Sequence, residues 1–541
     1  YNLIGNSPCV DSGTADIDQD GIDDIIDYFG SAPDMGAFEL ICESNIYDQC
    51  GICDGDDSSC LGCTDAEALN YSPYNFIDDG SCMYPIAQDI WVSPNGDDNL
   101  NTGLDGSSPF KTINYALSVV DNPSEFATYT IHLSEGVYSP STNGEVFPII
   151  LKNYINIVGI SKESTILDAE GSMQIFKMEN TSGVALARLS VKNGIGDTGG
   201  GIYLNNARYC HIEDIYISNN IADYGGGIYI DDADCTIKNV LVFNNDSNND
   251  GAGVYINAES YFPSIENLVV TNNIADDDGG GIYIDNSISS SELLVNVGIT
   301  VDSNISSGDG GGIYLEGGNS NLIFKNSVIK NNEANNGGGL YLTSGGKFKG
   351  LELSQNHANL KGGGVWAWGY PNFENATITQ NTSFDVGGAI YANYLGGQWQ
   401  LTNSIIWNNS SPAIFSYNEV SDVESVITYS NVQDGFSGEG NIDLNPLFVD
   451  PDEDFHLQAG SPCIDSGTDD TNGDGVADIL EYIGLAPDMG AFEFEVDNLS
   501  NDEDFIPVSY SLKSPYPNPF NPSTTIEFEI PNYSYVSVDI L

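Results

Sequence analysis

The sequence predicts an all-β fold whose main body is a right-handed parallel β-helix, a solenoid of stacked coils. The pattern Gly-Gly-Gly-Ile-Tyr, or a close variant, recurs eight times at intervals of 25 to 31 residues. Within each repeat the apolar residues alternate with period two, as in strands and not helices. A second apolar run ending in an Asn pair then follows, as in 240–245, and we expect the Asn pairs to stack into a ladder from coil to coil at a second turn. Because one such unit cannot bury its own apolar face, units of this length stack and pair their strands in parallel sheets.

The N-terminal segment, residues 1–40, repeats near the other end of the chain at a constant offset of 454. Residues 7–9 return as 461–463, and residues 33–39 return as 487–493. We therefore expect residues 1–40 to be the closing end of a preceding β-helix domain, and the chain to be a fragment of a longer precursor.

Each of these two repeated ends contains an acidic loop with calcium-type spacing. Calcium takes six to eight oxygen ligands, and an EF-hand-like loop supplies them from positions 1, 3, 5, 7, 9 and 12, with Gly at position 6. We predict that both loops hold structural calcium, and that the residue at position 7 offers its backbone carbonyl as a ligand. The alternative is that each loop is a solvated acidic turn. Position 12 is Asp in the first copy, which weakens bidentate binding there. The candidate ligands are Asp470, Asn472, Asp474, Val476, Asp478 and Glu481 in the second copy, and Asp16, Asp18, Asp20, Ile22, Asp24 and Asp27 in the first.

Residues 41–86 form a predicted cysteine-rich module. Clustered cysteines in a short segment are typical of secreted, disulfide-bonded modules, so we expect three disulfides. A zinc site built on the two Cys-x-x-Cys pairs is the alternative. The segment 62–82 resembles a small spacer module of marine bacterial surface proteins. The six candidates are Cys42, Cys50, Cys53, Cys60, Cys63 and Cys82.

Residues 87–495 form the predicted β-helix. An amphipathic helix at about 110–120 is expected to cover the open end of the solenoid. Coils are expected from about residue 129 to about residue 457. Cys210 and Cys235 are one coil apart and are expected on adjacent coils, as a disulfide or as two buried thiols. The acidic segment 496–513 is a predicted linker.

Three segments resemble known families. The opening of the solenoid, 91–117, resembles the start of many right-handed β-helix proteins, including pectate-lyase-like ones. The Gly-Gly-Gly-Ile-Tyr and Phe243-x-Asn245 elements resemble the repeats of polymorphic outer-membrane adhesins. The segment Tyr516-Pro-Asn-Pro-Phe-Asn-Pro resembles the opening of a type IX secretion sorting domain, a small β-sandwich that is truncated here to 514–541. This resemblance implies export by the type IX machinery to the outer surface of a Gram-negative bacterium of the Bacteroidota or a related phylum.

The charge of the chain excludes some partners. Its 79 acidic residues against 14 lysines and arginines give a formal net charge of −65. Such a polyanion repels nucleic acid and anionic membrane surfaces and attracts divalent cations. No apolar run is long enough to span a bilayer. A column of aspartates, Asp250, Asp278 and Asp309, precedes the glycines, and its two interpretations are cation binding between coils and simple solvated turns.

The aromatic residue after each glycine run is expected on the outer face of the solenoid. In Ile228-Tyr229-Ile230 the two isoleucines share one face of the strand, and the ring takes the other. Such a row can stack against sugar rings of an extracellular glycan. The alternative is that the rings stack on one another and shield the sheet. The candidate glycan contacts are Trp366, Trp368, Tyr370, Tyr341 and Tyr391.

No catalytic residue is assigned from the sequence, because basic residues are few, the four histidines are scattered, and no lyase or hydrolase motif is present. We predict a secreted, surface-attached, non-catalytic protein for adhesion or for binding glycan or matrix, stabilised by calcium. One alternative is a calcium-dependent polysaccharide lyase or glycoside hydrolase acting on an extracellular polysaccharide. The other is a purely structural surface spacer.

Overall fold

The structure is a computed structural model that describes residues 88–288, 294–317, 322–394, 399–418 and 426–495. It also describes residues 12, 14–17, 35, 61–66, 68, 71–75 and 77–82, and two short strands at 511–512 and 528–529. The chain divides into two units, Tyr1–Glu493 and Phe494–Leu541. Among the described residues, no helix has the length and apolar character needed to cross a membrane.

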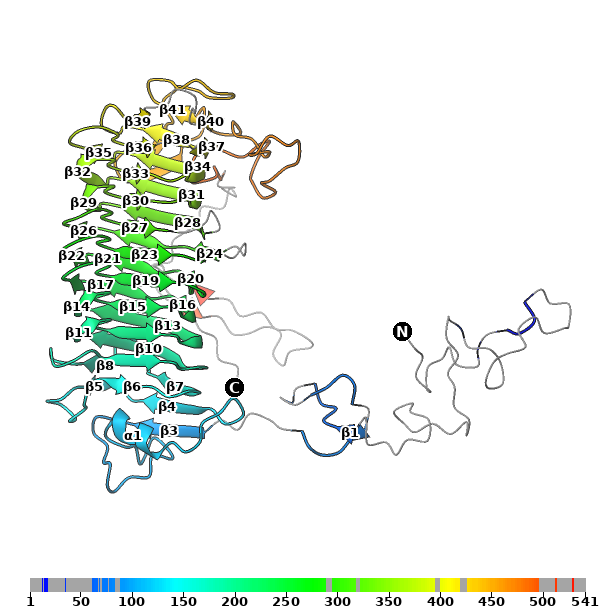
Figure 1. The fold of residues 1–541 in the computed structure, drawn as a ribbon, viewed down its shortest axis with the longest axis vertical. Coiled ribbons are helices and arrows are strands. Elements are labelled where there is room, and N and C mark those ends of the chain that lie inside the picture. Colours follow the sequence, from blue (N-terminus) through cyan, green and yellow to red (C-terminus); the bar gives the residue numbers. More distant parts are fainter. Residues whose placement is uncertain are drawn as a thin grey trace. The chain divides into compact units, whose positions relative to one another are not determined.

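The first unit contains a right-handed parallel β-helix, which confirms the predicted fold class (Figure 1). Three parallel sheets run along the solenoid, and each strand pairs with the equivalent strand one coil away. The Gly-Gly-Gly-Ile-Tyr repeats supply most of an 11-stranded sheet. Its strands are β6 (Ile149–Ile150), β9 (Phe176–Glu179), β12 (Ile202–Asn205), β15 (Ile228–Asp231), β19 (Val254–Ala258), β23 (Ile282–Asn286), β27 (Ile313–Glu316), β30 (Leu340–Leu342), β33 (Val365–Ala367), β36 (Ile390–Tyr394) and β39 (Ile414–Asn418).

An 8-stranded sheet of short strands leads into the glycine runs. Its strands are β11 (Ile195–Thr198), β14 (Ile221–Tyr224), β18 (Asp246–Ser247), β22 (Ile274–Ala275), β26 (Ile305–Ser306), β29 (Glu333–Asn336), β32 (His357–Lys361) and β35 (Thr382–Ser383).

The third sheet bends in the middle of most coils. A residue with positive φ lies at each bend, such as Asn326 in β28 (φ 48°) and Gly350 in β31 (φ 64°), and Asn and Gly adopt this conformation most readily. Its strands are β3 (Gln88–Val92), β4 (Tyr129–Leu133), β5 (Gly136–Tyr138), β7 (Ile155–Val158), β8 (Thr165–Asp168), β10 (Ala185–Lys192), β13 (Arg208–Ser218), β16 (Asp234–Lys238), β17 (Leu241–Phe243), β20 (Ser264–Glu266), β21 (Val269–Thr271), β24 (Leu294–Val297), β25 (Thr300–Asp302), β28 (Leu322–Lys330), β31 (Lys347–Ser354), β34 (Asn372–Thr379), β37 (Gln400–Thr402), β38 (Ile405–Trp407), β40 (Val426–Thr428) and β41 (Asn431–Val432).

The core fills the inside of the coils, as the alternating pattern predicts. Ile228 and Ile230 are fully buried, and so are their counterparts in the coils on either side. Because the side chains of a strand alternate between its two faces, the residue between them points outward. A row of stacked phenylalanines inside the coil, Phe324, Phe348 and Phe373, was not predicted; successive ring centroids are 5.2 and 5.1 Å apart.

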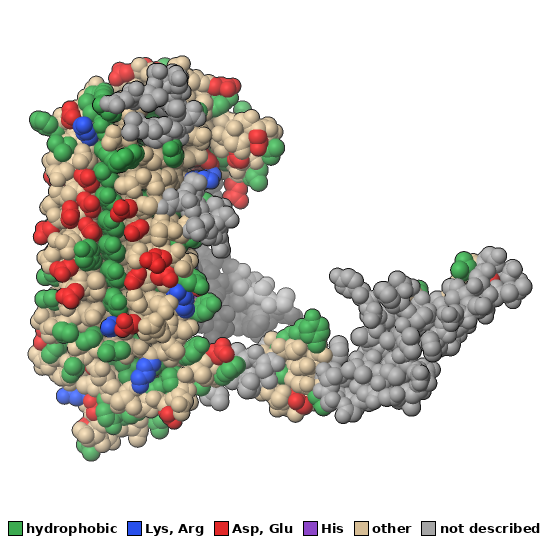
Figure 2. Space-filling model, in the orientation of Figure 1, with side chains coloured by type: hydrophobic (Ala, Val, Ile, Leu, Met, Phe, Trp, Pro, Cys, Tyr) green, Lys and Arg blue, Asp and Glu red, His purple; other side chains and the backbone are tan. Residues whose placement is uncertain are grey.

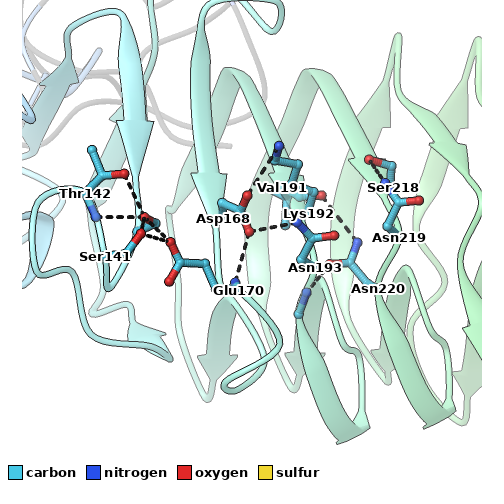
Figure 3. Close-up of polar contacts among 12 residues, drawn as sticks. Ser141, Thr142, Asp168, Glu170, Val191, Lys192, Asn193, Ser218, Asn219 and Asn220 are labelled. Atoms are coloured by element: carbon cyan, nitrogen blue, oxygen red, sulfur yellow. Dashed lines mark hydrogen bonds and ion pairs between the residues drawn. The ribbon is translucent and has the colours of Figure 1, made fainter.

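The asparagine ladder at the corner between the bent sheet and the 8-stranded sheet was predicted from the Asn pairs. The last Asn of each run is buried, apart from the half-buried Asn409 at the end of the ladder. Its side-chain amide donates to the Oδ1 atom of the equivalent Asn in the next coil, as from Asn245 to Asn273 at 3.0 Å. The first Asn of a pair makes the turn, as Asn244 does with φ 53°. Figure 3 shows the lower end of this corner, where Asn220 donates to the carbonyl of Val191. The ladder contains Asn220, Asn245, Asn273, Asn304, Asn332, Asn356, Asn381 and Asn409.

The parallel ladder ends earlier than expected. Its last strand is β41, and the predicted limit of about residue 457 is wrong. The reason is that β42 (Phe448–Asp450) and β43 (Asp454–Leu457) pair with each other in antiparallel fashion and do not continue the coils. Alternating apolar residues mark a strand but not the direction of its partner.

The entrance cap is confirmed as helix α1 (Ile113–Val119), with Thr112 as its N-cap. Its apolar face is buried through Ile113, Ala116 and Leu117. The buried Glu145, from a loop of the next coil, accepts hydrogen bonds from the backbone N–H groups of Ile113 at 2.7 Å and Asn114 at 3.1 Å. A carboxylate at a helix N-terminus satisfies donors that have no partner within the helix.

The cysteine predictions are confirmed where the structure describes them. Cys63 forms a disulfide with Cys82, so a zinc site that uses Cys63 is wrong. Short strands β1 (Leu61–Gly62) and β2 (Ile77–Asp78) pair beside it. Cys210 and Cys235 are register partners on adjacent coils and form a disulfide. The other four candidates, Cys42, Cys50, Cys53 and Cys60, lie outside the described residues.

In the second unit, Phe494–Leu541, the described strands β44 (Ser511–Leu512) and β45 (Phe528–Glu529) pair in antiparallel fashion. β45 lies in the segment that resembles the truncated sorting domain. β44 lies within the segment predicted as a linker, 496–513.

Candidate functional site

A tyrosine column runs along the outer face of the 11-stranded sheet. Its rings are nearly parallel and stack coil on coil; Tyr255, Tyr283 and Tyr314 have successive centroid distances of 4.9 Å. The rings therefore stack on one another, as one of the two interpretations of the sequence expected. The column contains Tyr203, Tyr229, Tyr255, Tyr283, Tyr314, Tyr341, Trp366, Tyr391 and Phe415. Phe415 extends the column by one coil beyond the predicted row.

Stacking covers most of each ring inside the column. Trp366 is 7 % exposed and Tyr391 is 4 % exposed, although both face outward from the sheet. Trp368 and Tyr370, in the turn after β33, are each 53 % exposed. The five candidate glycan contacts therefore divide into covered members of the column, which include Tyr341, and two exposed aromatic side chains at its edge.

The glycine runs allow the chain to turn tightly before each tyrosine strand. Gly279 has φ 66°, and a Cβ atom on Gly281 would lie 2.6 Å from the carbonyl oxygen of Gly312 in the next coil. Any larger residue at this position would push adjacent coils apart, because the backbones are in direct contact there.

Acidic side chains line both sides of the tyrosine column (Figure 2). On one side the aspartates of the predicted column form a ladder, in which the backbone N–H of Asp278 donates to Asp250 at 3.0 Å and that of Asp309 donates to Asp278 at 2.7 Å. On the other side, two residues after the tyrosines, Asp231, Asp285 and Glu316 lie in register with Asn205 and Asn257. The hydroxyl of Tyr283 donates to Glu316 at 2.5 Å.

Burial and mutual repulsion change the pKa values on this face. Burial, together with the charges of Asp277, Asp309 and Asp250, raises the pKa of Asp278 to about 7. Burial and the charge of Asp231 raise the pKa of Tyr229 to about 12, so its hydroxyl stays a hydrogen-bond donor. Asp250, Asp277 and Asp278 form the one group of three metal-ligating side chains that the described part of the chain brings within 4.8 Å.

The second calcium-type loop lies at the end of the first unit. Asp470 accepts the backbone N–H groups of Gly473 at 2.7 Å, Asp474 at 3.1 Å and Gly475 at 2.8 Å. Asp478 accepts from Thr471 and Asn472. The glycines at positions 4 and 6 both have positive φ. The chemistry of the donor set, carboxylates with an amide and a carbonyl, fits calcium, which prefers hard oxygen ligands.

The first calcium-type loop lies outside the described residues except for Ile17 and Asp16, and the carbonyl of Asp16 accepts from the Thr14 hydroxyl. Its other candidates, Asp18, Asp20, Ile22, Asp24 and Asp27, are not described. The four histidines lie on separate elements: β4 contains His132, β13 contains His211, β32 contains His357, and β43 contains His456. The structure therefore does not bring them together.

Part of this region matches the model of a described family. Residues 200–383, which carry the tyrosine column from Tyr203 to Trp366, match the family model of the right-handed beta helix region. The curated "Metabotropic glutamate receptor-like protein P" of Dictyostelium discoideum is 30% identical over 128 residues. That match covers 23% of this chain and only 8% of the relative's length.

Three of the similar solved structures are as follows. Pectate lyase Pel9A has 16% identity and a TM-score of 0.41, over 76% of this chain and 98% of the other. The A-module of the Azotobacter vinelandii mannuronan C-5 epimerase AlgE6 has 14% identity and a TM-score of 0.34, over 59% of this chain and 92% of the other. The PL6 family alginate lyase AlyGC has 12% identity and a TM-score of 0.40, over 73% of this chain and 60% of the other.

Proposed function

We propose that this protein is a secreted, surface-attached and non-catalytic β-helix that binds an extracellular glycan or matrix. The observation that carries the proposal is the pair of exposed aromatic side chains, Trp368 and Tyr370, at the edge of a rigid column of covered rings. Large aromatic side chains supply much of the binding energy at recognition surfaces, and a half-exposed Trp offers a ring face to a sugar.

The covered rings have a supporting role in this proposal. Because Trp366 and the tyrosines stack on one another, their faces are occupied, and only their edges and hydroxyls meet solvent. A stack of this length holds the outer face of the sheet rigid, so the exposed pair lies on a pre-organised surface. Export by the type IX machinery, attachment to the outer surface of a Gram-negative cell and calcium loading belong to the same proposal.

Replacing Trp368 by Ala is expected to weaken glycan binding about tenfold or more, because one aromatic anchor at a recognition surface contributes about 1–2 kcal/mol or more. Affinity electrophoresis of the full chain through a panel of soluble polysaccharides identifies the ligand and measures the loss. Phe384→Ala is the matched control, since Phe384 is 86% exposed and lies after β35, on the 8-stranded sheet.

Equal losses in the two variants would contradict the proposed site. Release of unsaturated or new reducing ends from any polysaccharide would contradict the non-catalytic assignment and favour the lyase or glycosidase alternative. Absence of binding to every glycan and matrix tested would favour the structural spacer.

Calcium is expected to raise the thermal unfolding temperature of the full chain, and Asp474→Ala is expected to remove most of this increase. Asp474 is the proposed ligand at position 5 of the loop, and its carboxylate accepts the N–H of Val476 at 2.8 Å. Differential scanning calorimetry with calcium and with a chelator measures the shift. Asp197→Asn, an exposed carboxylate on β11, is the control. No calcium effect on the parent chain would contradict the prediction.

A further inference from the structure

A pocket of about 450 Å³ lies where the segment 478–493 folds against the bent sheet. Its volume is within the range of sites that bind small molecules and single sugar units. One wall is formed by Lys325, Lys349 and Glu374, which are register partners on β28, β31 and β34. The opposite wall contains Asp478, Ile479, Leu480, Glu481 and Glu493.

Lys238, Lys325 and Lys349 belong to one column of register partners along the bent sheet. Lys325 differs from the other two lysines in its ion pairing. Lower in the same column Lys238 pairs with Glu266 at 3.0 Å, and in the pocket Lys349 pairs with Glu374 at 2.8 Å. Lys325 instead has Val297 on one side and Lys349 on the other. Among the residues that the structure describes it forms no ion pair, although the chain has 79 acidic residues. Two ammonium groups thus lie side by side on adjacent coils.

The carboxylates opposite these lysines are mostly engaged. Asp478 accepts from Thr471 and Asn472, and Glu493 accepts the backbone N–H groups of Ile483 at 3.1 Å and Asp488 at 3.0 Å. The pocket floor is open at the bend of the sheet because Gly350 has no side chain there. A Cβ atom on Gly350 would lie 2.7 Å from Oδ1 of Asn326. Among the described residues that line the pocket, the charged side chains without a hydrogen-bond or ion-pair partner are therefore Lys325 and Glu481.

We propose that this pocket binds the sulfate ester of a sulfated saccharide, with the ester oxygens on Lys325 and Lys349. Lysines act as point charges, whereas planar carboxylates are matched best by the fork of an arginine, and no arginine is among the described residues that line the pocket. A sulfate ester presents three oxygens to two separate ammonium groups. A phosphate monoester carries a charge near −2 at pH 7, which Glu481 and Glu493 disfavour.

The inference rests on the proposed glycan binding but uses a different site from Trp368. Binding of the full chain to dextran sulfate, carboxymethyl-dextran and dextran is compared by isothermal titration calorimetry, because these polymers share one backbone. We expect the sulfated polymer to bind most tightly. Lys325→Gln is expected to lower its affinity about tenfold, the effect of losing one charge-assisted hydrogen bond. Lys238→Gln, the matched control outside the pocket, is expected to leave the affinity unchanged.

Three results would overturn the inference: no binding to dextran sulfate, equal affinity for the carboxymethylated polymer, or equal losses in the two lysine variants. Circular dichroism melting confirms that each variant is folded. Loss of binding with Trp368→Ala but not with Lys325→Gln would leave the proposed function standing and reject this pocket, and the reverse result would support the pocket alone.

Discussion

Asn304→Ala is expected to lower the free energy of unfolding of the β-helix by about 3–4 kcal/mol. The Asn304 side chain is fully buried in the middle of the asparagine ladder. Its Nδ2 group donates to the carbonyls of Val270 at 3.0 Å and Asp302 at 3.2 Å and to Asn332 at 3.0 Å. Its Oδ1 atom accepts from the backbone and the side chain of Asn273. Alanine leaves these buried partners unsatisfied, and the cost of that exceeds the value of the bonds themselves.

Urea unfolding followed by far-UV circular dichroism measures the effect. Asn248→Ala is the matched control, since Asn248 is an exposed asparagine that donates to the carboxylate of Asp223 at 2.8 Å. We expect the control to change stability by less than about 0.5 kcal/mol. A loss below about 1 kcal/mol for Asn304→Ala would show that water enters the corner and replaces the ladder.

The second large effect is a dependence of stability on pH that comes from the acidic ladder. The pKa of Asp278 in the folded chain is about 7, above the ordinary value of 3.8, so the folded state holds this proton more tightly than the unfolded state. The contribution of Asp278 to stability is therefore fully present below about pH 4 and is lost as the pH rises through about 7. For a fully buried group, this pKa difference would correspond to a change of about 4 kcal/mol in the free energy of unfolding between low and high pH. Because this carboxylate is partly solvated, we expect a change of about 1–2 kcal/mol.

Asp278→Asn tests this expectation, because an amide imitates the protonated carboxyl at every pH. In buffer that contains a chelator, the free energy of unfolding of the variant is expected to exceed that of the parent by about 1–2 kcal/mol at pH 8. At pH 4 the two values are expected to be nearly equal. Denaturant midpoints across this range measure the difference. Asp197→Asn again serves as the control, with a pH profile parallel to that of the parent. A variant that is less stable than the parent at pH 8 would contradict the prediction.

Several parts of the structure follow from the sequence because they depend on local pattern. Alternation fixes which face of a strand is apolar, so Ile228 and Ile230 had to point inward and Tyr229 outward. Repetition at the length of one coil then places like residues above like, which predicts both the tyrosine column and the asparagine ladder. The cap helix follows from its amphipathic pattern, although the contact from Glu145 does not, because that residue comes from another coil.

Other features depend on distances across the fold, which no local pattern contains. The sequence could not decide between glycan binding and self-stacking for Trp366 and Trp368, which differ by only two positions. Hydrogen bonding between coils sets a spacing near that of stacked rings, about 4.8 Å, so Trp366 is covered by its neighbours above and below. Trp368 lies past the end of β33, outside the tyrosine column, and is exposed.

The arrangement of the charged groups also depends partly on the sequence pattern and partly on the folded structure. The composition determined that the surface is acidic, and the repeat determined that Asp250, Asp278 and Asp309 lie in one column. Only the tertiary structure decided that these carboxylates are partly buried and lie near other acidic groups, and both effects raise their pKa values. Only the folding back of 478–493 brought acidic side chains opposite Lys325, more than a hundred residues earlier in the chain. Electrostatic energy depends on separation in space and on burial, and both are properties of the folded chain.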